Sequence, residues 1–118
     1  MGYPVVHFEV VGKDMQALQS FYKDAFDWQI EQYLDTPYAM ARPGGEGSIN
    51  GGIGHAVDGG AGHVTFYVAV PDLEMALSKI ESLGGSTVME PSEVPEGPSI
   101  AMFTDPEGHL VGLIKANS

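Results

Sequence analysis

The chain has 118 residues, of which 43% are hydrophobic, so it has the size and composition of one ordinary domain that can bury a core. Its 16 acidic and 5 basic residues give a formal net charge of −11, which repels nucleic acid and anionic lipid and favours cationic partners. The absence of cysteine excludes disulfides and thiolate chemistry, and without a charged leader or an apolar run of membrane-spanning length we expect a cytoplasmic protein that binds neither nucleic acid nor membrane.

The first half of the chain predicts a strand, a helix and three further strands. Side chains alternate with period two over residues 5–11, which places His7 and Glu9 on one face of the strand. Asp14 is suited to cap a helix that ends near residue 26 or 27. The buried stripe predicted for this helix is Met15, Leu18, Tyr22 and Ala25. Short strands are predicted over 28–33, 37–41 and 49–54, so this half is βαβββ.

The second half repeats this order. Residues 64–70 alternate again, with Thr65 and Tyr67 on one face. Pro71-Asp72 opens a helix that Gly84-Gly85 ends, and its predicted buried stripe is Leu73, Ala76, Leu77, Ile80 and Leu83. Further strands are predicted over 86–90, 100–104 and 110–114. The segment 91–98 contains three prolines and is predicted as a surface loop, a candidate lid, rather than a strand.

The two halves also share residues when the chain is aligned with itself. One shift aligns Phe8 with Phe66, Val10 with Val68, Asp14 with Asp72 and Ser20 with Ser78. We therefore predict a single domain, 1–118, that uses one structural unit twice: module 1 over about 4–55 and module 2 over about 62–116. The joint between them is predicted at residues 59–62, and the cleft between the modules is the expected functional site.

Five segments carry a resemblance to a known family. They are VHFEV (6–10), FYKDAFDW (21–28), VAVPDL (68–73), LGG (83–85) and DPEGH (105–109). In this order and spacing they resemble the vicinal oxygen chelate (VOC) superfamily, which includes glyoxalase, bleomycin-resistance and extradiol-dioxygenase relatives. The resemblance covers nearly the whole chain. It implies an α+β, glyoxalase/bleomycin resistance-like fold, in which two βαβββ modules form an incomplete barrel around a cavity, and it implies a homodimer.

The resemblance also identifies where a metal would bind. Metal-using members place four side chains on one divalent ion, a His or similar donor on the first strand of each module and usually a Glu or His on the last. His7 matches one position, whereas the other three fall on Thr65, on Gly112 and at or next to Gly52. Transition-metal sites need three or four placed donors, so we predict no intact metal site. The alternative is a divalent ion held by His7, Glu9 and His63.

Several side chains are candidates for a ligand site. His7 and Glu9 are the candidate catalytic residues and also candidate ligand contacts, because a cavity would raise the pKa of a buried carboxyl and suit it to acid–base work or to a cationic ligand. The alternatives are a core histidine and a solvated carboxylate. Asn50, Thr65 and Tyr67 offer amide and hydroxyl groups on the predicted inner faces, with packing as the alternative for Tyr67.

Roles can also be predicted for two glycines and for the remaining aromatic and histidine side chains. Gly52 and Gly112 are predicted to leave room for a bulkier ligand. Trp28, Tyr33 and Tyr38 are candidates for an aromatic wall, with Trp28 alternatively sealing the end of the first helix. His55 is assigned to the surface and His109 to a turn.

The sequence thus favours a metal-independent protein that binds a small, cationic or amine-bearing molecule, as in the bleomycin-resistance branch that it resembles, with no cofactor. The alternative is a metal-dependent lyase or isomerase of the glyoxalase type, or a dioxygenase-related enzyme, that uses His7, Glu9 and His63. A third alternative is an interaction module with a vestigial cavity. Because a shared fold does not carry a shared chemistry, the choice depends on the site.

Overall fold

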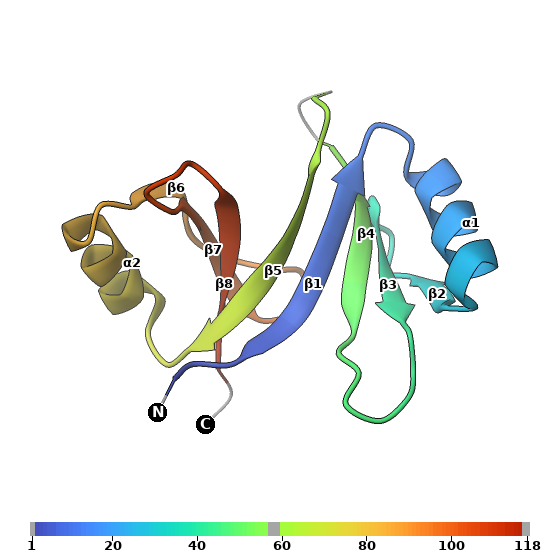
Figure 1. Cartoon of the computed structure of the whole chain (residues 1–118), viewed down its shortest axis with the longest axis horizontal. Coiled ribbons are helices and arrows are strands. Elements are labelled where there is room, and N and C mark those ends of the chain that lie inside the picture. The colour runs from blue at the N-terminus through green and yellow to red at the C-terminus, as the bar shows by residue number, and fades with distance from the viewer. Residues whose placement is uncertain (1, 57–59, 117–118) are drawn as a thin grey trace. The chain divides into compact units, whose positions relative to one another are not determined.

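The computed structural model describes residues 2–56 and 60–116. Within these residues the chain forms eight strands and two helices (Figure 1). Its contacts divide it into two compact units, residues 7–64 and residues 1–6 with 65–118. The predicted α+β class and the two successive βαβββ modules are confirmed. Residue 59, part of the predicted joint, lies outside the described residues.

The unit of residues 7–64 is a four-stranded sheet with one helix. Its elements are β1 (Val5–Gly12), α1 (Met15–Phe26), β2 (Gln29–Gln32), β3 (Tyr38–Arg42) and β4 (Gly51–His55). The strand order is β2-β3-β4-β1, with β1 parallel to β4 and the other pairs antiparallel. Figure 1 shows α1 beside β2 to β4. The buried core beneath the helix consists of Met15, Ala39, Ala41 and Ile53.

Local signals fix both ends of α1. The Asp14 side chain accepts a hydrogen bond from the Ala17 N–H at 3.0 Å, as an N-cap does, and Asp27 ends the helix in the left-handed conformation with φ of 59°. The predicted stripe is right up to Tyr22 but wrong at Ala25, which is exposed. Beyond Tyr22 the indole of Trp28 stacks on that ring at 5.2 Å and takes over the contact with the sheet, so Trp28 seals the helix end.

The second unit repeats the arrangement. Its elements are β5 (His63–Val70), α2 (Leu73–Ser82), β6 (Ser86–Glu93), β7 (Ser99–Thr104) and β8 (Leu110–Lys115). The strand order is β5-β8-β7-β6, with β5 parallel to β8 and the other pairs antiparallel. Its buried core consists of Val70, Leu73, Leu77, Ala101 and Leu113.

The stripe of α2 ends earlier than predicted. Asp72 caps the helix by accepting from the Met75 N–H at 3.0 Å, and Leu73 and Leu77 are buried as expected. Leu83, however, is 68% exposed, because it is the C-cap and its backbone has already left the helical conformation. Of the helices within the described residues, none is long and apolar enough to cross a membrane.

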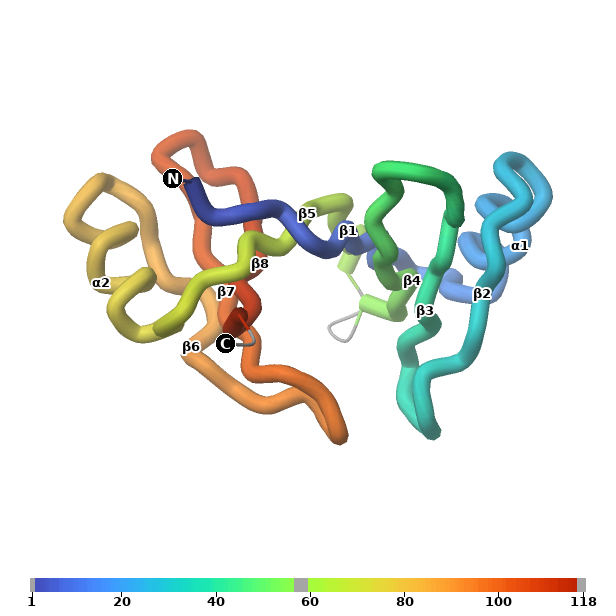
Figure 2. The backbone as a smooth tube through the Cα atoms, turned by 90° about the horizontal axis from the view of Figure 1, so that it is seen from below, coloured from blue at the N-terminus to red at the C-terminus, as the bar shows by residue number. Residues whose placement is uncertain are grey.

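The prediction of a loop over 91–98 is wrong for its first three residues. β6 continues through Pro91 to Glu93 and pairs with β7, to which a hairpin joins it (Figure 2). Proline is tolerated here because β6 is the outer strand of its unit and the register shifts between Met89 and Ser92. The remaining residues form the turn, which the Val94 N–H closes by donating to the Pro98 carbonyl at 2.9 Å.

Candidate functional site

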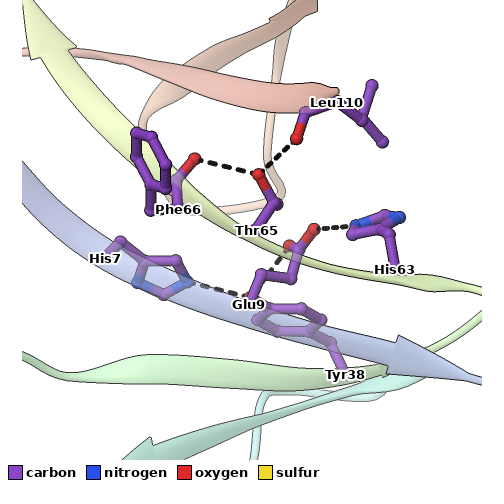
Figure 3. Close-up of polar contacts among 7 residues, drawn as sticks. All are labelled: His7, Glu9, Tyr38, His63, Thr65, Phe66 and Leu110. Atoms are coloured by element: carbon purple, nitrogen blue, oxygen red, sulfur yellow. Dashed lines mark hydrogen bonds and ion pairs between the residues drawn. The ribbon is translucent and has the colours of Figure 1, made fainter. Parts of the chain in front are cut away.

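A buried carboxylate is the centre of a hydrogen-bonded network in the unit of residues 7–64 (Figure 3). Glu9, on β1, is only 7% exposed. Its Oε2 lies 2.7 Å from His63 Nε2, and its Oε1 accepts from the Tyr38 hydroxyl at 3.1 Å. The same hydroxyl lies 2.9 Å from His7 Nε2. The structure therefore links His7, Tyr38, Glu9 and His63, which reach the network from β1, β3 and the start of β5.

The bonding pattern places a proton on Nε2 of His7. The Tyr38 hydroxyl donates its proton to Glu9, so it accepts a hydrogen bond from the Nε2–H of His7. Burial lowers the pKa of His7 from its ordinary value of 6.5, and the Glu9 carboxylate offsets part of this effect. His7 is accordingly a neutral hydrogen-bond donor at pH 7.

This pKa shift predicts a pH-dependent stability. Because the unfolded chain takes up a proton at His7 before the folded chain does, the free energy of unfolding is expected to fall as the pH drops below about 6.5, by up to about 1.4 kcal/mol per pH unit. Urea unfolding of the wild type and of His7→Gln between pH 7 and pH 5 measures this slope. The variant should lose most of it, whereas replacement of the exposed His55 by Gln should leave it unchanged. Equal slopes in all three proteins would contradict this role of His7.

Gly52 makes room for the Tyr38 ring. A Cβ at position 52 would overlap the hydroxyl and two ring carbons of Tyr38. Tyr38 reaches this position because it lies on the neighbouring strand, where Met40 pairs with Gly52 and Tyr38 with Gly54. The expectation that Gly52 leaves space for a ligand is therefore wrong, since the protein's own tyrosine fills that space.

The second unit has the same arrangement, in which a tyrosine ring fills the space beside a glycine. Tyr67 is 5% exposed and pairs directly with Gly112, where a Cβ would lie 2.5 Å from the Tyr67 ring. The expectation of free space at Gly112 is wrong for the same reason. Thr65, also buried, donates its hydroxyl hydrogen bond to the Leu110 carbonyl at 2.5 Å. In this unit the Tyr67 ring lies over Gly112, and the Thr65 hydroxyl donates to the backbone.

The other candidates have contacts or exposure of their own. Asn50 is exposed and precedes β4, where its backbone carbonyl accepts from the Phe8 N–H at 3.4 Å. His55 is exposed, as predicted. His109 occupies the predicted turn, with its Nδ1 3.0 Å from Asp105 Oδ2.

Tyr38 is the network residue whose role sequence reasoning missed. We assigned it to an aromatic wall, whereas its hydroxyl bridges a histidine and a carboxylate. The available signal is the pair of glycines at 52 and 54, since a strand with two small residues on one face leaves space for a large side chain from its neighbour.

The network is not arranged as a metal-binding cluster. Within residues 2–56 and 60–116, no group of three or more His, Cys, Asp or Glu side chains is placed to hold an ion. Coordination by His7 Nε2 and Glu9 Oε1 would require both to give up the Tyr38 hydroxyl. What the arrangement can do chemically is hold a negative charge among hydrogen-bond donors and exchange a proton between a carboxylate and an imidazole.

Comparisons with known proteins agree with this fold. The family model described as Glyoxalase/Bleomycin resistance protein/Dioxygenase superfamily matches residues 5–113. CFP32 of Mycobacterium bovis, named as a candidate glyoxylase, is 30% identical over 113 residues, which cover 88% of this chain and 42% of CFP32. The chain thus spans less than half the length of the curated relatives that it matches.

Two solved structures show the same fold. A glyoxalase/bleomycin resistance protein/dioxygenase superfamily member from Vibrio splendidus has a TM-score of 0.65 at 17% identity and covers 98% of this chain and 100% of its own. Methylmalonyl-CoA epimerase from Mycobacterium tuberculosis has the same TM-score and identity, with coverages of 97% and 88%. At these identities the likeness is one of fold.

Proposed function

Because the chain belongs to the glyoxalase/bleomycin resistance protein/dioxygenase superfamily, we propose that it binds a small amine-bearing molecule through Glu9 without a metal ion. The observation that carries this proposal is the Glu9 carboxylate, 7% exposed and hydrogen-bonded by Tyr38 and His63. A carboxylate withdrawn from water is stabilised by hydrogen-bond donors and by positive charge, because these replace its lost hydration.

The donor and acceptor inventory favours an ammonium group over a metal ion. An ammonium has three N–H donors, and a carboxylate has about four lone-pair sites that can accept them, of which Tyr38 and His63 each use one at Glu9. A transition-metal ion needs three or four donors from the protein, whereas position 52 supplies no side chain and is filled by the Tyr38 ring. The net charge of −11 also favours the approach of a cation.

The second candidate function is a metal-dependent lyase or isomerase of the glyoxalase type. Two observations favour it: the 30% identity to CFP32, named as a candidate glyoxylase, and the presence of His7, Glu9 and His63 in one network. To hold the ion, which would supply Lewis-acid chemistry, the three side chains would have to leave their present hydrogen bonds.

A thermal-shift series with primary amines tests the proposal. An amine at 100 times its Kd should stabilise the protein by about 2.7 kcal/mol and raise its melting temperature, whereas alcohols of the same size and shape should not. Glu107→Gln, which removes an exposed carboxylate from the other unit, should respond as the wild type does. Amines that act no better than their alcohols would contradict amine binding.

Metal analysis of protein purified without chelator separates the two candidates. Binding without metal predicts no stoichiometric divalent ion. A stoichiometric ion that is lost in His7→Ala would instead establish the second candidate.

A further inference from the structure

A groove lies beside β2 and the C-terminal end of α1. Its volume is about 700 Å³, and its walls combine acidic and apolar side chains. The acidic ones are Asp24, Asp27 and Glu31, beside Lys23, Trp28 and Ile30. The groove lies entirely within the unit of residues 7–64, and it takes no part in the Glu9 network.

Among the described residues of this unit, no strand lies next to the outer side of β2. β2 is the outermost strand of the order β2-β3-β4-β1. The Tyr33 N–H donates to the Tyr38 carbonyl at 2.9 Å, and antiparallel pairing alternates, so the backbone of Glu31 also faces β3. The backbone N–H and C=O groups of Ile30 and Gln32 consequently point away from β3. Such an edge is a template for one more strand.

The charge at the groove is unbalanced. Asp24 and Asp27 stand at the C-terminal end of α1, where the helix dipole is negative and basic residues are favoured. Among the described residues neither carboxylate forms an ion pair, whereas Glu31 pairs with Arg42. Lys23 is the one cation in the last turn of α1, so two carboxylates and a helix C-terminus leave a net negative charge beside the outer side of β2.

The groove also presents apolar surface. Phe26 is 58% exposed, and its ring lies 5.7 Å from that of Trp28, which lines the groove with Ile30. An occupant that suits both the charge and this surface carries basic and apolar side chains.

We propose that β2 binds an extended basic segment of another protein as an added strand. The backbone groups of Ile30 and Gln32 pair with the segment, its basic side chains meet Asp24 and Asp27, and its apolar side chains pack against Trp28. A second copy of this chain is a poor occupant, because its own β2 carries Glu31 and each copy has a net charge of −11.

Trp28 is the only tryptophan in the chain, so its fluorescence reports on the groove directly. The probe is a blocked hexapeptide of alternating lysine and valine. Its matched control is a peptide of alternating lysine and proline, which has the same charge but cannot form a strand ladder. We expect the lysine–valine peptide to change Trp28 emission with a Kd at least tenfold lower than that of the control, and to bind more weakly as salt is added.

Substitutions distinguish the contribution of charge to peptide binding from that of strand pairing. Asp24→Asn combined with Asp27→Asn should weaken binding at least tenfold, whereas Glu90→Gln combined with Glu107→Gln, two exposed carboxylates of the other unit, should not. Ile30→Pro should abolish binding, because it removes an outward N–H that β3 does not use. Amide exchange in the wild type gives the same information without a substitution: the peptide should slow exchange at Ile30 and Gln32.

Two results would overturn the proposal. One is equal affinity for the two peptides, which would make the groove a general cation site. The other is a fluorescence response without slower exchange at Ile30 and Gln32, which would place the peptide in the groove without strand pairing.

Discussion

Gly52→Ala is expected to lower the free energy of unfolding by about 2–4 kcal/mol, a large effect for one added methyl group. The new Cβ would overlap the Tyr38 hydroxyl and ring, so the ring must move. Moving it breaks its hydrogen bonds with His7 and Glu9 and adds strain within the sheet. Urea unfolding monitored by circular dichroism measures the change.

A double-mutant cycle identifies the cause of this loss. In a Tyr38→Ala background the ring is absent, so adding Gly52→Ala should cost less than about 1 kcal/mol. Gly2→Ala is the control, because no atom lies within 4 Å of a Cβ at that position, and it should leave the stability of the wild type unchanged. An equal cost of Gly52→Ala with and without the tyrosine would show that the glycine is needed for another reason.

Glu9→Gln is expected to weaken amine binding about 10- to 100-fold while changing stability little. Hydrogen bonds to charged groups contribute about 1.5–3 kcal/mol, and the amide retains the shape of the carboxylate without its charge. The Gln oxygen still accepts from Tyr38, and His63 accepts from the Gln amide by changing tautomer. Isothermal titration with the amine that gives the largest thermal shift measures the affinity.

Glu9→Ala provides the comparison for the conservative variant. It leaves the Tyr38 hydroxyl and His63 Nε2 without their acceptor, so it should lower stability by about 2 kcal/mol or more. Unchanged amine affinity in Glu9→Gln would exclude the Glu9 carboxylate as the binding group and would leave it a structural role.

Local structure is the part of the fold that could be read from the sequence. The capping roles of Asp14 and Asp72 follow from the residues next to them, and both are confirmed. The end of β6 could not be read in this way. Pro91 disfavours a strand on its own, but pairing with β7 continues through it because β6 is the outer strand.

The same distinction between neighbouring residues and strand pairing applies to the candidate site. Period-two alternation placed His7 and Glu9 on one face of β1, and both belong to the observed network. Tyr38 was missed because it comes from another strand, and the sequence alone does not align β3 with β1.

By itself the sequence determined which residues form strands and helices and which face of β1 carries the polar side chains, since these properties depend on neighbours a few positions apart. Only the tertiary structure decided that Tyr38 bridges His7 and Glu9 and occupies the space above Gly52. The physical reason is register: which side chains meet across a sheet depends on the pairing of segments distant in sequence, and a slip of one residue would place Tyr38 on the opposite face.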